Sequence, residues 1–239
     1  MDVNNLDKLE NMIKLGPKEI ISVVGAGGKT SFINYIANKY KDKMRVLITA
    51  TTKIYVPSKN IYNNIHMLDE DKKIIISKDL GITVIGKYIN KEKKIVGLDF
   101  KELEHLIPKF DLILIEGDGS KRKKLKGWNN KEPIVYPKST KTIGILDITS
   151  YNMEINDKNI HRLEELRKIT NINNTKVDIN NLVDIVLNKN GLFKNACGQE
   201  ILLINRIKSN HDKNIAKQLI CEINKYKNDL TIICNTEKL

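Results

Sequence analysis

The stretch Ile20-Ile21-Ser22-Val23-Val24-Gly25-Ala26-Gly27-Gly28-Lys29-Thr30 decides the fold of this chain. An apolar, β-branched run ends at a glycine cluster, after which the apolar spacing of a helix continues to about residue 40. A strand, glycine loop and helix in this order are typical of a phosphate site, because loop amides, the helix N-terminus and a lysine converge on one anion. The pattern G-x-x-G-K-T is shorter than the usual P-loop, which would have a glycine at position 23. A plain glycine turn between strand and helix is the alternative.

Polar residues that follow the first two expected strands predict a nucleotide site. Lys29 would supply a positive charge to the phosphates, and the hydroxyl of Thr30 would reach a magnesium ion. A hydroxyl-rich connection follows the next strand and adds candidate phosphate contacts. The residues expected to bind the nucleotide are Gly25, Ala26, Gly27, Gly28, Lys29, Thr30, Thr51, Thr52 and Lys53.

A second buried strand, expected over 112–115, ends in Glu116-Gly117-Asp118. An acidic residue at the end of an apolar strand is typical of magnesium–nucleotide sites, where it holds the metal or orients the attacking group. Strand alternation would point both carboxylates the same way. We therefore expect Lys29, Glu116 and Asp118 as catalytic residues and Thr30, Glu116 and Asp118 as Mg²⁺ ligands. A turn rich in Gly and Asp is the structural alternative.

Strand and helix patterns alternate along the chain and predict one α/β domain over 1–239, with a mainly parallel sheet covered by helices on both faces. Short β-like runs at 74–76, 83–89 and 94–96, with a turn at 90–93, predict an antiparallel hairpin insertion or a sheet edge within about 60–98. The other expected strands are 20–24, 46–49, 132–136, 142–147, 201–205 and 230–234. The expected helices are 6–15, 29–40, 100–107, 159–169, 178–188 and 212–226.

Composition narrows the class of partner. The 239 residues are 41% hydrophobic and 29% charged, as in ordinary soluble domains. The net charge of +12 favours anionic ligands, but the lysines are spread along the chain and only 5% of residues are aromatic. We therefore expect a nucleotide and an anionic small-molecule substrate, and favour these over nucleic acid, with RNA binding as the weaker alternative. Three widely spaced cysteines, no signal peptide pattern and no membrane-length apolar run predict a cytoplasmic protein without a membrane partner.

Two further segments are candidates for substrate contacts. Residues 121–126 hold five basic side chains and precede the single tryptophan, Trp128. They form either an electropositive rim for an anionic substrate or a solvated surface run. His161 and Arg162 lie at the start of the helix expected over 159–169, with Asp157 or Asn159 as its cap. They face either a substrate or the solvent.

The order of these pieces resembles that of the YqeC family, accessory proteins of selenium-dependent molybdenum hydroxylases. The resemblance spans about residues 18 to 208, and the glycine loop together with Glu116-Gly117-Asp118-Gly119-Ser120 is its most specific part. The further matching pieces are Thr51-Thr52-Lys53, Lys126, Glu132-Pro133, His161-Arg162, Gly191-Leu192-Phe193-Lys194 and Leu203-Ile204-Asn205. In this family alanine is commoner where this chain has Gly117.

The resemblance implies a P-loop NTPase-like protein that uses Mg²⁺ and a nucleotide in selenium-cofactor maturation, with a molybdenum hydroxylase or other maturation proteins as partners. After Asn205, family members often carry an acidic residue that could read guanine, whereas this chain has Lys208, so ATP is expected over GTP. The loop is also similar to that of the ATP-dependent Mur ligases. Two alternatives to a hydrolase or phosphoryl-transfer enzyme stay open: a nucleotide-gated chaperone with little turnover, and an activating ligase.

Overall fold

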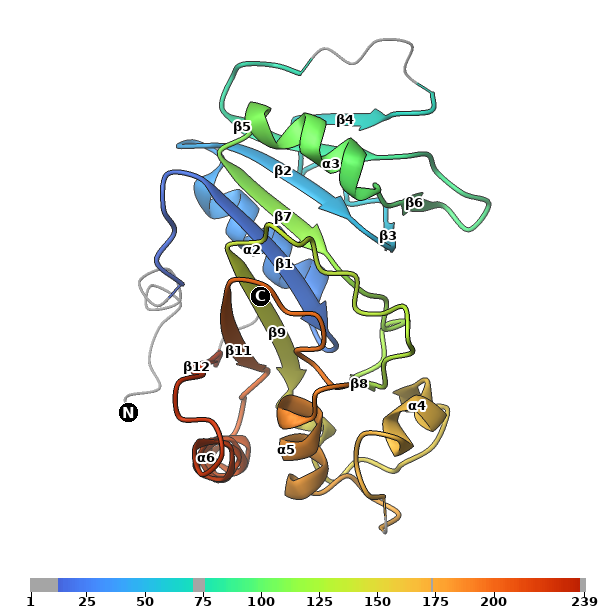
Figure 1. Ribbon diagram of the computed structural model, residues 1–239, viewed down its shortest axis with the longest axis vertical. Coiled ribbons are helices and arrows are strands. Elements are labelled where there is room, and N and C mark those ends of the chain that lie inside the picture. Colours follow the sequence, from blue (N-terminus) through green and yellow to red (C-terminus); the bar gives the residue numbers. More distant parts are fainter. Residues whose placement is uncertain (1–12, 71–75, 173, 237–239) are drawn as a thin grey trace.

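In the computed structural model, which describes residues 13–70, 76–172 and 174–236, a parallel sheet runs through the whole molecule (Figure 1). Its strand order is β12-β11-β9-β1-β7-β2-β5-β4. Every pairing between these strands is parallel. The strands are β1 (Glu19–Gly25), β2 (Arg45–Ala50), β4 (Asn64–Met67), β5 (Gly81–Gly86), β7 (Leu112–Glu116), β9 (Lys141–Asp147), β11 (Gln199–Asn205) and β12 (Thr231–Cys234).

Helices cover both faces of this sheet, which explains why its central strands are apolar runs without alternation. One face packs on α2 (Lys29–Tyr40), whose Phe32, Ile33 and Ile36 are buried there. The other face is shared, with α3 (Phe100–Leu106) over one half. The half around β9 and β11 packs on α5 (Ile179–Leu187) and α6 (Asn210–Asn224). The α/β class and the mainly parallel sheet are thus confirmed.

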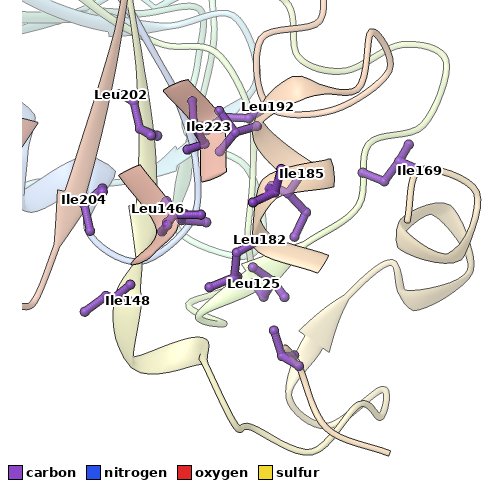
Figure 2. Packing of buried hydrophobic residues seen from close by; sticks show 14 of the residues in the cluster. Leu125, Leu146, Ile148, Ile169, Leu182, Ile185, Leu192, Leu202, Ile204 and Ile223 are labelled. Atoms are coloured by element: carbon purple, nitrogen blue, oxygen red, sulfur yellow. The ribbon is translucent and has the colours of Figure 1, made fainter. Parts of the chain in front are cut away.

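Two small sheets lie beside the large one. Strand β3 (Lys53–Tyr55) pairs antiparallel with β6 (Lys94–Val96), and β8 (Leu125–Lys126) pairs parallel with β10 (Ile160–His161). Figure 2 shows Leu125 beside Leu182 of α5, within the same buried cluster as Leu146 of β9. The second small sheet is therefore anchored in the core.

Between 60 and 98 the chain forms the expected sheet edge, and its antiparallel strand β6 pairs with β3, which precedes this range. Strands β4 and β5 extend the edge of the parallel sheet, whereas β6 contributes to the antiparallel pair. The expected turn at 90–93 is present, with the Asn90 amide donating to the Lys94 carbonyl oxygen. The runs expected at 6–15 and 74–76 fall mostly outside the described residues. Strand β4 was not expected, because Asn-Ile-His-Met gives no clear strand pattern.

Two expectations for secondary structure were wrong. Residues 132–136 form an irregular segment instead of a strand, because Pro133 has no N–H to donate and the backbone bonds of Ile134 run to single partners, its amide to the Gly117 carbonyl and its carbonyl to the Thr51 hydroxyl. The helix expected over 159–169 is replaced by β10 and the short helix α4 (Leu163–Arg167). Arg162 between them has a left-handed backbone (φ 58°), which no helix can continue through.

The remaining helices and strands confirm their expected positions. Helix α5 begins at a capping box of Asp178 and Asn181, and α6 begins at one of Ser209 and Asp212. Cys197, Cys221 and Cys234 are free thiols, and burial raises the pKa of Cys234 to about 11. No helix in the described ranges is long and apolar enough to cross a bilayer.

Candidate functional site

The chain changes direction across the sheet at β1. After β1 it builds the β7, β2, β5 and β4 side, and only after β7 does it cross to β9, β11 and β12 on the other side (Figure 1). In open parallel sheets, ligands bind outside the carboxyl ends of the strands at such a reversal. The residues that follow β1, β7, β9 and β11 are therefore the ones to consider as a site.

The glycine loop (residues 25–28) is packed so tightly that its three glycines have no room for a side chain. Gly25, Gly27 and Gly28 have φ angles of 101°, 86° and 136°. A Cβ on Gly27 would lie 2.3 Å from the Cβ of Asp147, and one on Gly28 would lie 2.3 Å from Nδ2 of Asn205. The loop therefore rests on the ends of β9 and β11, and its glycines are required both for backbone conformation and for space.

The loop's amides face in two directions. Those of Gly25 and Ala26 are bound inward, by the Asp118 carboxylate and the Ile145 carbonyl. The first bond of α2 runs from the Phe32 amide to the Gly28 carbonyl, so the amides of Lys29 and Thr30 belong to the helix end that lacks intrahelical partners. This end lines the cleft described below, and it is a suitable cradle for an anion.

Lys29, Thr30 and Glu116 meet at the start of α2. The Nζ of Lys29 donates to the Gly25 carbonyl at 2.6 Å and lies 3.9 Å from Oε1 of Glu116. The Thr30 hydroxyl donates to Oε2 of Glu116 at 2.9 Å. Burial raises the pKa of Glu116 more than the nearby Lys29 and Thr30 lower it, so a cation arriving at this carboxylate would stabilise its charge.

Asp118 lies behind the loop and not in the cleft. Its side chain is fully buried and accepts bonds from the Gly25 amide (3.1 Å), Lys126 Nζ (2.9 Å) and the Trp128 indole (2.7 Å). Lys29 Nζ lies 3.3 Å from Oδ1. Burial alone would raise the pKa of Asp118, but Lys29 and Lys126 outweigh it and hold the pKa below its ordinary value. Asp118 therefore holds the Gly25 amide of the loop and the Lys29 side chain in position.

The hydroxyl-rich connection after β2 lies across the cleft. The Thr51 hydroxyl donates to the Ile134 carbonyl oxygen at 2.6 Å, whereas the buried Thr52 hydroxyl has no partner within the described part of the chain. Lys53 is exposed and lines the cleft. Of the residues expected to bind the nucleotide, Gly25 and Ala26 are buried in the body of the protein, and the remainder line the cleft.

Residues at the ends of β9 and β11 complete the site, and Asp147 among them was missed from the sequence. Asp147 is fully buried, accepts from Arg206 at 2.9 Å and from the Thr149 hydroxyl, and has its pKa raised by burial. Asn205 donates to the Gly27 carbonyl at 2.7 Å. Asp147 follows an apolar strand directly, as Glu116 does, and that position was the available signal.

A buried chain of charges connects the small β8–β10 sheet to the loop. The Nζ of Lys126 is completely enclosed. It donates to the carboxylates of Asp118 and Glu132, at 2.9 Å each, and to the Gly119 carbonyl at 2.6 Å. Arg162 holds Glu132 through both of its terminal nitrogens. Removing one member would leave a buried charge without its partner, so this arrangement makes the loop's surroundings rigid.

These strand ends border an open cleft of about 930 Å³. Glu116 and Glu132 are the carboxylates that line it, against eight basic side chains. These are Lys29, Lys53, Lys94, Lys121, Arg122, Lys123, Arg162 and Arg206. Among described residues no group of three or more His, Cys, Asp or Glu side chains could hold a metal ion. Mg²⁺ does not need such a cage, because it is commonly held by one or two carboxylates together with the phosphates of its nucleotide.

Fold and cleft define a parallel α/β protein with a glycine loop at the reversal point of its sheet. The chain matches the family described as YqeC protein over residues 21–164, a range that includes the loop, Glu116, Asp118 and the β8–β10 sheet, and it belongs to this family. It is similar to the uncharacterized protein YqeC of Escherichia coli (strain K12), with 29% identity over 192 residues that cover 77% of this chain and 75% of the relative. No solved structure matches the chain.

Proposed function

We propose that this protein is a cytoplasmic enzyme that binds a magnesium nucleotide, preferably ATP, and hydrolyses it or transfers its terminal phosphoryl group. The observation that carries the proposal is the cluster of Lys29, Thr30 and Glu116 at the end of a glycine loop that faces a cationic cleft. In the cell the activity would serve selenium-cofactor maturation for molybdenum hydroxylases. That last element rests on the resemblance to the YqeC family and not on the geometry.

Phosphate binding would use the amides at the start of α2 together with Lys29. In the structure Lys29 Nζ donates to a carbonyl of its own loop, an interaction that a terminal phosphate would replace at little cost. Asp118 would act as a positioning residue, because it grips both the Gly25 amide and Lys29. Charge neutralisation and alignment are the main contributions a protein makes to phosphoryl transfer.

The residues present fit Mg²⁺. A threonine hydroxyl and a carboxylate are hard oxygen ligands, and the Thr30–Glu116 pair lies at the loop where the nucleotide's phosphates would supply further oxygens. The ion would neutralise charge on the phosphates when bound. Thr30 and Glu116 would hold it, and the remaining alignment falls to Lys29. Asp118 is enclosed by four donors and is not proposed as a ligand.

The preference for ATP is supported by the surroundings of Asn205. Its amide nitrogen is used by the Gly27 carbonyl and its oxygen by Asn235 and the Arg206 amide, so the side chain is occupied in fixing the loop. Lys208 stands where an acidic residue would accept hydrogen bonds from guanine. Nothing at this position therefore favours GTP.

Calorimetry with two variants tests the proposal. Lys29→Ala should weaken MgATP binding about 10- to 100-fold, since a charge-assisted phosphate contact contributes about 1.5–3 kcal/mol. Thr30→Ala should weaken MgATP binding while leaving metal-free ATP binding unchanged. Lys131→Ala, an exposed lysine outside the cleft, serves as the control. Unchanged MgATP affinity in folded Lys29→Ala protein would rule out this site.

Turnover separates the enzyme from a nucleotide-gated chaperone. The enzyme hydrolyses ATP, or transfers its phosphoryl group to a small acceptor, in the absence of other proteins. A chaperone would bind MgATP tightly and release phosphate at an appreciable rate only when a molybdenum hydroxylase is added.

A further inference from the structure

The cleft extends beyond the glycine loop to a second group of cations. Lys53 from β3, Lys94 from β6, and Lys121 and Arg122 from the turn after β7 line this part of it. The exposed ring of Tyr55 lies between two of them, with the Arg122 guanidinium 4.3 Å and Lys94 Nζ 5.1 Å from its centre. Segments far apart in the sequence thus bring positive charge to one place.

Backbone strain is concentrated in the basic residues of this cleft. Among described residues, eight that are not glycine have a positive φ, and four of these line the cleft. All four are cationic: Lys121 (49°), Arg122 (61°), Arg162 (58°) and Arg206 (65°). Left-handed backbone is unfavourable for such side chains, and it persists only where the surrounding structure enforces it. The enforced result here is a set of cations directed at one cavity.

The strained turn is firmly held in place. The side chain of Lys123 donates to the carbonyl oxygens of Asp157 and Ile160, and its amide donates to Ser120. Leu125, two residues later, packs beside Leu182 in the core (Figure 2). Lys121 and Arg122 are therefore presented from a fixed base and are not part of a loose surface run.

The positive charge at this end is largely uncompensated. Lys53 and Lys121 form no ion pair within the described ranges. Glu92 is paired with Lys94 at 2.8 Å, and the pKa of this exposed carboxylate is lowered first by Lys94 and then by Lys53 and Lys121. Four cations against one carboxylate match a multiply charged phosphate better than a single carboxylate.

We propose that Lys53, Lys121 and Arg122, with Lys94 beside them, form a second anion site that binds a phosphate-bearing small molecule in the same cleft as the nucleotide. This inference rests on the proposed function for the identity of the first ligand. The second ligand is the protein's other substrate, held in the part of the cleft that these cations line.

Titration with inorganic pyrophosphate at 150 mM salt tests the proposal. The wild-type protein should bind two pyrophosphates per chain, one at the loop and one at the second site. Saturating MgADP should leave one binding event. Lys121→Ala/Arg122→Ala should weaken that remaining event at least tenfold and leave MgADP binding in place. Both residues are exposed, so the double variant should fold. The conservative Lys121→Arg variant keeps the charge and should retain binding.

A charge-matched control separates a site from a general charge effect. The Lys91→Ala/Lys124→Ala variant also loses two positive charges, but from exposed positions that do not line the cleft. It should bind both pyrophosphates as the wild type does. Equal weakening by the two double variants overturns the second site, as does a single pyrophosphate per chain in the wild type without MgADP. Failure of the proposed function would give a different result, because Lys29→Ala would then change the affinity of neither pyrophosphate.

Discussion

At the scale of single residues, Gly27 shows how closely the loop is fitted to its surroundings. Its φ of 86° suits glycine, and the place of a side chain is already taken by Asp147. Its carbonyl oxygen is bound by Asn205. The ends of β9 and β11 therefore both hold this residue, which helps to fix the direction of the loop's amides.

Gly27→Ala should lower the free energy of unfolding by about 2–3 kcal/mol, because the new Cβ must displace Asp147 and adopt a strained backbone. MgATP binding should also be lost. Gly119→Ala is the matched control, since this glycine is in the same cleft with open space around it, and it should change stability by less than about 0.5 kcal/mol. Urea unfolding measures both. A Gly27→Ala protein as stable as Gly119→Ala would contradict the packing argument.

At the scale of elements, the two-stranded β8–β10 sheet brings together charged side chains that are far apart in the sequence. Lys126 and His161 are paired in register, and Arg162 follows directly. Burial lowers the pKa of His161 to about 4, assisted by the positive charges of Lys126, Arg162 and Lys121 and opposed by Glu132. The imidazole is therefore neutral in the folded protein from pH 7 down to about pH 4.

This depressed pKa predicts a loss of stability in acid. The unfolded chain protonates His161 near pH 6.5, whereas the folded protein resists protonation until about pH 4. Folding is therefore penalised progressively as the pH falls from about 6.5 to 4, and the penalty is absent above this range. His161→Gln should lose less stability between pH 7 and pH 5 than the wild type, as measured by urea midpoints. An identical pH dependence in both proteins would exclude this account.

The element scale also shows where local patterns mislead. The apolar spacing of Ile160, Leu163 and Leu166 indicates a helix, and all three are buried as expected. Pairing of β10 with β8 nevertheless takes the first of them into a strand. The pattern thus predicted the burial of these residues correctly and their secondary structure wrongly. Three apolar residues at this spacing fit a helix, but they also fit a strand followed by a turn.

At the scale of the whole molecule, the candidate site lies on the most central strands. β1 lies between β7 and β9 in the middle of the eight-stranded sheet, and the glycine loop follows it directly. A ligand bound there contacts parts of the chain that separate only when the sheet unfolds. Binding is therefore linked to global stability and not to the opening of one loop.

Saturation with MgATP should accordingly raise the melting temperature. At 100 times its Kd, a ligand that binds only the folded state adds about 2.7 kcal/mol, or roughly 5–10 °C for a chain of this size. MgGTP at the same concentration should give a smaller shift, and Lys29→Ala should reduce both shifts to about half or less. Differential scanning fluorimetry provides the measurement. Equal shifts in the wild type and Lys29→Ala would show that the nucleotide binds elsewhere.

The sequence by itself determined the features whose cause is local. Apolar runs predicted the central strands, and the glycine spacing with Lys29 and Thr30 predicted the loop. The acidic end of an apolar run predicted Glu116 as a candidate site residue. Each of these depends on residues a few positions apart, where periodicity and turn chemistry act.

Only the tertiary structure decided which distant residues complete the site. Asn205 reaches Gly27 across 178 positions, and Asp147 arrives beside the loop because β9 pairs with β1. Asp118 points into the interior, where Lys126 and Trp128 bind it. The cations of the proposed second anion site come from three separate segments. Strand order and burial result from contacts between remote parts of the chain, and no short stretch of sequence specifies them.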